Sequence, residues 1–158
     1  NFGMNQNMTI LLAWSAGLEQ FQSLGASTLE GVYLGAQYWH QEDAPANRKL
    51  VELCRDVHGI NPGYPLAGNY QATRMILDAA AEAGSTDPAD VIAAMEGRQY
   101  AGITGDETIR AVDHQVLKRY YLLQGKAESK MRDEDDFVDI VSTGKSFVSA
   151  ADSACELG

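Results

Sequence analysis

The order of strand-like and helix-like segments constrains this chain more than any single motif. Residues 8–13 (MTILLA) form a continuous apolar run of strand length, which is typical of a strand buried on both faces of a parallel sheet. Leu18, Phe21 and Leu24 then recur at helical spacing, and a second strand is expected at residues 31–34. Strand, helix and strand make one βαβ unit, which predicts an α/β fold.

Three amphipathic helices are expected after this unit. Pro45 fits the first turn of a helix that ends at Gly59. The next helix starts near Pro65, and its spacing predicts an inward stripe made of Leu66, Tyr70, Thr73, Leu77 and Ala80. A third helix opens at Pro88 and stops at Gly97.

The final third changes to a strand-like period. Strands are expected at residues 108–111 and 116–123, joined across a turn, and a shorter strand at residues 137–141. Between them, residues 126–136 are interpreted as a solvated acidic loop. Because the three helical stripes have little local sheet to cover, we expect part of the fold to lie outside this chain.

Composition excludes several classes of partner. Hydrophobic residues make up 45% and charged residues 22% of the 158 positions, which is ordinary for a globular protein. The net charge is -10, and the 12 basic residues are scattered, so no nucleic acid is expected as a partner. No apolar run approaches the ~18 residues of a membrane span. No leader is visible, but a chain that starts at Asn1 gives no information on compartment from that.

Metal and redox sites fail on spacing. His40, His58 and His114 are dispersed, and Cys54 lies too far from Cys155 for a C-x-x-C motif, so no metal or cofactor is expected. If the two cysteines pair, the bridge closes a long loop and contributes up to ~4.7 kcal/mol, in an oxidising compartment. The alternative is one buried and one exposed thiol, and the residues leave both open.

Five segments, in order, resemble the C-terminal part of type I periplasmic solute-binding proteins, the leucine/isoleucine/valine-binding group. They are LEGVY (29–33), ANRKLVELCRDVHG (46–59), the helix from Tyr70 to Ala83, the segment from STDP (85–88) to Gly97, and YAGITG (100–105). The resemblance runs from Met8 to about Lys126. Each segment is weak alone, and their joint order carries the resemblance.

The resemblance implies two α/β lobes that are joined by crossing strands and bind a ligand between them. On that scheme, residues 1–36 belong to lobe II, residues 37–103 add helices to lobe I, and residues 104–158 return to lobe II. The crossings are expected near residues 35–38 and 103–105. The implied role is the periplasmic or extracellular component of an ABC importer, with a small-molecule solute, a membrane permease and a missing N-terminal part as partners.

By the same resemblance, the loop after the first strand faces the cleft with Trp14, Ser15 and Ala16. Amino-acid binders of the family place a carboxylate near the position of Trp14, where it holds the ligand's ammonium group. Trp14 instead favours stacking on an aromatic or aliphatic ligand, or it packs at the rim of the core.

Four further candidates follow the crossing and open the second lobe I helix. Tyr38 and Trp39 would line the mouth of the cleft or pack in the core. Asn69 and Tyr70 start a helix that faces the cleft in the family, although Tyr70 also fits the buried stripe of that helix.

Two other classes of function remain as alternatives. Residues 13–17 (AWSAG) differ at one position from the G-x-S-x-G nucleophile elbow of serine hydrolases. Asp87 and His114 follow Ser15 in a chain order that such a triad permits. The binding fold also serves ligand-sensing receptors. The transport role requires no catalytic residues, so we expect no enzyme.

Overall fold

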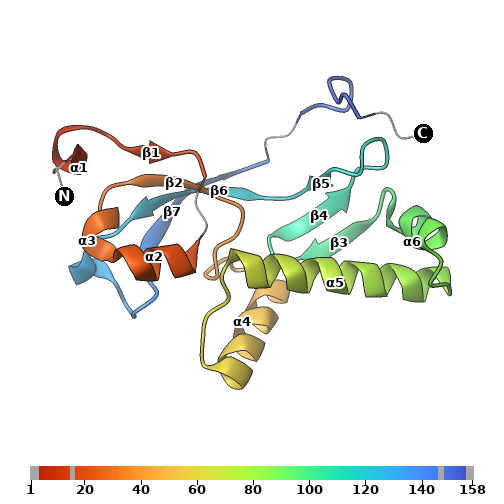
Figure 1. Ribbon diagram of the computed structural model, residues 1–158, viewed down its shortest axis with the longest axis horizontal. Helices are drawn as coiled ribbons and strands as arrows, with labels where there is room; N and C mark the ends of the chain where they lie inside the picture. Colours follow the sequence, from red (N-terminus) through yellow and green to blue (C-terminus); the bar gives the residue numbers. More distant parts are fainter. Residues whose placement is uncertain (1–3, 15–16, 146–147, 156–158) are drawn as a thin grey trace.

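The computed structural model describes residues 4–14, 17–145 and 148–155. These residues form two sheets, each with its own hydrophobic core (Figure 1). We call the two parts the sheet body and the helical body. The two cores agree with the sequence argument that the helices do not cover the sheet of the βαβ unit.

The sheet body is built on a four-stranded sheet with the order β1-β2-β6-β7. Its elements are α1 (Met4–Asn7), β1 (Leu11–Leu12), α2 (Leu18–Leu24), α3 (Ala26–Leu29), β2 (Tyr33–Ala36), β6 (Tyr120–Gly125), η1 (Glu128–Lys130) and β7 (Val138–Gly144). β1 and β2 are parallel, and the other neighbours are antiparallel. The first core therefore contains the predicted βαβ unit, with Phe21 of α2 and Leu34 of β2 buried in it.

The helical body combines three helices with a small antiparallel sheet of order β3-β4-β5. Its elements are α4 (Pro45–His58), α5 (Tyr64–Ala83), α6 (Pro88–Met95), β3 (Gln99–Gly102), β4 (Gly105–Ile109) and β5 (Val116–Leu117). Its core consists of Tyr38, Leu50, Cys54, Ala67 and Ile103.

The predicted helix boundaries are confirmed where local chemistry sets them. α4 starts at Pro45 and ends before Gly59, whose φ of 68° is left-handed and favours glycine. Asp87 caps α6, because its carboxylate accepts a hydrogen bond from the Ala89 N–H at 2.9 Å.

The first strand differs from the prediction. β1 contains only Leu11 and Leu12, and these side chains are 64% and 43% exposed rather than buried on both faces. The physical reason is its position at the edge of the sheet, where it pairs with β2 alone among the described strands.

The predicted inward stripe of α5 is wrong in its C-terminal half. Leu77 is 62% exposed and Thr73 is exposed, whereas Ala67 and Ala79 are fully buried. Small alanine side chains let neighbouring elements approach this helix closely, so they form the contact face, and the larger leucine points away from the described chain.

The strand expected at residues 116–123 is divided between the two bodies. β5 pairs with β4 in the small sheet, and β6 pairs with β2 and β7 in the large one. The chain changes sheets at Lys118 and Arg119 and not near residues 103–105, where a crossing was expected. There, Gly102 and Gly105 close the β3–β4 hairpin instead. The division of the chain into lobes stays a prediction. In the structure, two segments cross from one body to the other: residues 37–44, the first crossing, and residues 118–119, the second crossing.

Candidate functional site

Two adjacent rings anchor the first crossing in both cores. Tyr38 is 3% exposed and lies in the core of the helical body. Trp39 is 1% exposed and belongs to the core of the sheet body, with its ring 5.6 Å from that of Phe21. Both rings are thus buried between packed elements in this structure, and their role at the mouth of the cleft stays a prediction.

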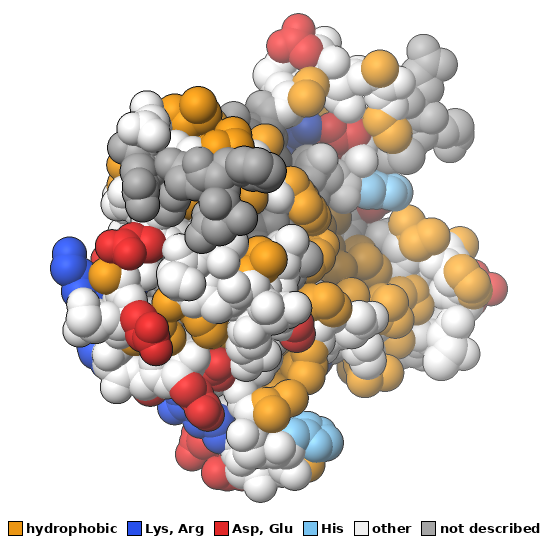
Figure 2. Space-filling view, turned by 60° about the vertical axis from the view of Figure 1, so that its left-hand side comes forward, with side chains coloured by type: hydrophobic (Ala, Val, Ile, Leu, Met, Phe, Trp, Pro, Cys, Tyr) orange, Lys and Arg blue, Asp and Glu red, His pale blue; other side chains and the backbone are white. Residues whose placement is uncertain are grey.

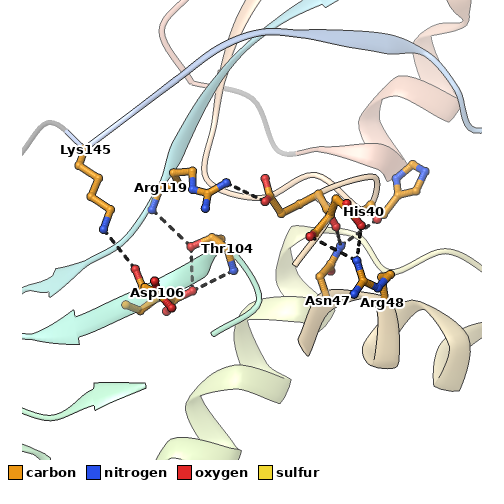
Figure 3. Close-up of polar contacts among 10 residues, drawn as sticks. His40, Asn47, Arg48, Thr104, Asp106, Arg119 and Lys145 are labelled. Carbon is orange, nitrogen blue, oxygen red and sulfur yellow. Dashed lines mark hydrogen bonds and ion pairs between the residues drawn. The ribbon is translucent and has the colours of Figure 1, made fainter. Parts of the chain in front are cut away.

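Asn47 fixes the first crossing to α4. This side chain is fully buried; its Nδ2 donates to the carbonyl oxygens of His40 at 2.9 Å and Glu42 at 2.8 Å (Figure 3). Its Oδ1 accepts from the Tyr38 hydroxyl at 2.7 Å. Burial raises the pKa of Tyr38 well above its usual range, so this hydroxyl stays a donor.

The second crossing is tied to the first. Arg119 Nη1 lies 2.9 Å from Glu42 Oε1, and the Arg119 backbone N–H donates to Thr104 Oγ1 at 3.3 Å (Figure 3). Lys118 Nζ donates to the Gln37 carbonyl oxygen at 3.5 Å, and burial lowers the pKa of this ammonium group. These bonds hold the two crossings side by side.

A buried carboxylate supports Thr104 in turn. Glu107 is 2% exposed; its Oε1 accepts from Thr104 N and Oγ1 at 3.0 and 2.7 Å, and its Oε2 accepts from the Tyr100 hydroxyl at 2.9 Å. A Cβ at Gly102 would lie 2.2 Å from the carboxyl carbon of Glu107, so glycine leaves the space for it. The second crossing is thus tied through Thr104 to the β3–β4 hairpin.

The two bodies face each other where the loop after β1 meets the start of α5. The Trp14 ring lies edge-to-face with the Tyr64 ring at 5.9 Å, and Trp14 is 58% exposed. A Cβ at Gly17 would lie 3.5 Å from Tyr64 Cβ, and one at Gly63 would lie 2.0 Å from Glu19 Oε1. The junction therefore combines an exposed indole with a carboxylate placed at a helix start.

The start of α5 adds hydrogen-bond donors to this junction. The helix is capped by Gly63 without a side-chain hydrogen bond, so its first N–H groups carry the positive end of the helix dipole. Such a junction can hold a small molecule that has an apolar part and a polar head. Tyr64, Gly63 and Glu19 carry no site signal in the sequence: Pro65 marks the helix start, but only the tertiary fold places that start against Trp14.

The other predicted site residues are not brought together at this junction in the described chain. Ser15 and Ala16 lie outside the described residues. Asn69 is exposed, and its Nδ2 donates to the Pro65 carbonyl oxygen at 2.8 Å. Tyr70 is half-buried against the core of the helical body, and its hydroxyl accepts from Arg74 at 3.4 Å.

The two cysteines are free thiols, so the disulfide candidate is not formed. Cys54 is buried in the core of the helical body, where α4 turns it inward, and Cys155 is exposed in the C-terminal tail. Burial raises the pKa of the Cys54 thiol. This is the alternative of one buried and one exposed thiol.

The acidic loop, residues 126–136, is not simply solvated. Asp136 is fully buried; it accepts from Arg132 Nε at 2.8 Å and Lys126 Nζ at 2.7 Å, and these bonds hold its pKa well below its usual range. His40 is 5% exposed, and burial lowers its pKa to about 4 although the nearby Asp135 opposes this shift.

The residues of the hydrolase alternative have other partners. Asp87 caps α6, and His114 Nε2 lies 2.8 Å from Glu96 Oε1. Ser15 lies outside the described residues. Within the described ranges, no three His, Cys, Asp or Glu side chains are grouped to hold a metal ion, and no helix is long and apolar enough to cross a membrane.

Comparisons with known proteins define the family. The family model described as periplasmic binding protein matches residues 1–130. The chain belongs to the periplasmic binding proteins. An amino acid ABC transporter substrate-binding protein from Pseudomonas fluorescens Pf-5 is 56% identical, with a TM-score of 0.97 over 99% of this chain and 42% of its own. Comparison with curated proteins gives no match.

More distant solved structures share the fold of this periplasmic binding protein. A periplasmic binding protein from Burkholderia mallei is 22% identical, with a TM-score of 0.84 over 98% of this chain and 41% of its own. An ABC transporter solute-binding protein from Rhodopseudomonas palustris BisB5 is 19% identical, with a TM-score of 0.70 over 82% of this chain and 34% of its own. The chain thus spans less than half the length of these proteins. The type I fold is confirmed, as is the resemblance of the sequence to type I periplasmic solute-binding proteins.

Proposed function

We propose that this chain is the C-terminal portion of the extracytoplasmic solute-binding component of an ABC importer, and that the solute binds between the two bodies. The single observation that carries the proposal is the pair of separate cores linked by crossings at residues 37–44 and 118–119. A solute that bridges the bodies stabilises their closed arrangement, which a membrane permease then recognises. No covalent step is needed.

Exposed apolar side chains support the presence of a further part of the fold. They include Leu11 and Leu12 on β1, Ile76 and Leu77 on α5, and Ile92 on α6. Figure 2 shows hydrophobic side chains gathered along a hollow of the molecular surface. We propose that the remainder of the protein covers these faces and supplies the opposite wall of the cleft.

The proposed solute is a small amino acid or an aromatic or aliphatic acid that contacts Trp14. The exposed indole offers a flat apolar surface to the side chain or ring of such a solute. Among proteins of the fold, the one from Rhodopseudomonas palustris was solved with 3,4-dihydroxybenzoic acid, and the Pseudomonas protein is named for amino acids.

The test is a solute screen on the full-length protein by thermal shift, with leucine, phenylalanine, benzoate and 3,4-dihydroxybenzoate as probes. We expect at least one probe to raise the Tm, and Trp14→Ala to weaken its binding about fivefold or more, since an aromatic contact contributes ~1 kcal/mol. Leu24→Ala, at a 45% exposed position in the last turn of α2, is the control. Equal binding by Trp14→Ala and wild type would refute the placement of the solute.

A further inference from the structure

A line of hydrogen bonds joins the two bodies beside the candidate site. Asp135 Oδ1 accepts from Gln22 Nε2 at 2.8 Å, and Asp135 Oδ2 accepts from Asn61 Nδ2 at 2.8 Å. Asn61 Oδ1 accepts in turn from Arg55 Nε at 2.8 Å. Gln22 lies on α2 of the sheet body, whereas Asn61 and Arg55 belong to the helical body, so a single carboxylate connects the two.

Asp135 is held firmly on the side of the sheet body. It is 6% exposed, and its neighbour Asp136 accepts from Lys126 and Arg132 and from Gln41 Nε2 at 2.7 Å. These bonds fix the acidic loop to the end of β6 and to the first crossing. If the bodies move relative to each other, Asp135 therefore stays in place and the hydrogen bond to Asn61 lengthens.

The hydrogen bond to Asn61 lies on the same side of the molecule as the contact between Trp14 and Tyr64. Residues 61–64 run along α2, with Tyr64 beside Gly17 and Gly63 beside Glu19. Asn61 lies beside Asp135 at the same face. Separation of the bodies at the site of Trp14 and Tyr64 therefore requires a change at Asn61 as well.

We propose that the Asn61–Asp135 hydrogen bond is a latch between the two bodies, which favours the arrangement seen here in the solute-free protein. The proposal rests on the proposed function only for its effect on solute binding. A hydrogen bond to a buried carboxylate is among the stronger ones, because the charge has lost its water. Its loss is expected to reduce the population of this arrangement about tenfold or more, and the affinity of a solute that binds this arrangement falls with that population.

The orientation of Asn61 allows an exchange of the two partners. Because Asn61 Oδ1 faces Arg55 Nε, its amide nitrogen must face Asp135. Asn61→Asp places two carboxylates against each other and breaks the latch. The double variant Asn61→Asp with Asp135→Asn restores a donor opposite an acceptor, keeps the contact with Arg55, and leaves an oxygen at position 135 for Gln22.

The experiment measures the distance between the bodies in the full-length protein without solute. Spin labels are attached to cysteines at two exposed positions, Ser27→Cys on α3 and Ala89→Cys on α6, with the exposed Cys155 changed to serine. The buried Cys54 stays unlabelled. Glu134→Gln, an exposed position on the same acidic loop, removes one negative charge as a matched control.

We expect Asn61→Asp to shift the distance distribution away from that of wild type, with the population at the wild-type distance reduced about tenfold or more. The double variant and Glu134→Gln are expected to keep the wild-type distribution. The proposal is overturned if Asn61→Asp keeps the wild-type distribution, or if the double variant shows the distribution of the single one. Because no solute is present, either outcome is independent of the solute-binding proposal.

Discussion

Single side chains show which parts of the site the sequence can predict. Trp14 is exposed at the junction, as its place after the first strand indicates. Tyr38 and Trp39 are adjacent aromatic residues with the same expected role, yet each enters a different core. Tyr64 lies opposite Trp14, and no local pattern marks it, because the contact joins segments far apart in the chain.

The buried imidazole of His40 predicts a dependence of stability on pH. Its pKa is about 4 in the folded protein against 6.5 when unfolded, so the unfolded chain takes up the proton first as the pH falls. The contribution of His40 to the free energy of unfolding is therefore fully present above about pH 6.5 and is lost as the pH falls from about 6.5 to 4. Between pH 7 and 4.5 the loss from this group is roughly 2–3 kcal/mol, at 1.36 kcal/mol per pKa unit.

The measurement is urea unfolding of wild type and His40→Gln at pH 7 and pH 4.5. The variant is expected to lose less stability on acidification than wild type. His58→Gln, at an exposed position of α4, is the control and should follow wild type. Identical pH dependence of wild type and His40→Gln would mean that His40 takes up its proton as readily in the folded protein.

The two thiols are expected to differ in reactivity. Cys155 is exposed and should react with a thiol reagent at pH 8 in the native protein. Cys54 is buried, and its raised pKa lowers its thiolate fraction, so it should react only after unfolding. Mass spectrometry after alkylation counts one modified thiol before unfolding and two after. No modified thiol in either state without reductant would instead demonstrate a disulfide.

At the level of elements, local signals predicted the helices better than the strands. Pro45, Gly59 and Asp87 start, end or cap a helix through contacts with residues a few positions away. Both ends of α4 and the start of α6 therefore follow from the sequence. The strand expected at residues 116–123 has a continuous β pattern, but its two ends pair with different sheets. Strand pairing depends on distant partners, which a single sequence window does not contain.

The cap of α6 gives a prediction at this level. Asp87→Ala should lower the free energy of unfolding by about 1 kcal/mol, because the Ala89 N–H loses its acceptor. Asp87→Ser keeps an acceptor oxygen and should retain most of the stability. Urea unfolding at pH 7 measures both; equal stability of Asp87→Ala and wild type would contradict a stabilising cap.

At the scale of the whole molecule, the element order predicted that part of the fold lies outside this chain. The sequence does not reveal where the two bodies touch: the bonds of Arg119 with Glu42 and Asn61 with Asp135 join residues of different elements. The crossings are short, and the cores on either side are apolar and separate. This construction suits two bodies that move against each other about residues 37–44 and 118–119.

The central claim is that this chain provides one part of a cleft that the complete protein closes around a solute. Isothermal calorimetry of the full-length protein and of the 158-residue chain, with the same probe from the thermal-shift screen, tests it most directly. The account predicts micromolar or tighter binding to the full-length protein and binding weaker by about a hundredfold or more to the isolated chain, since the opposite wall of the cleft is absent. Equal affinity of the two proteins would contradict it.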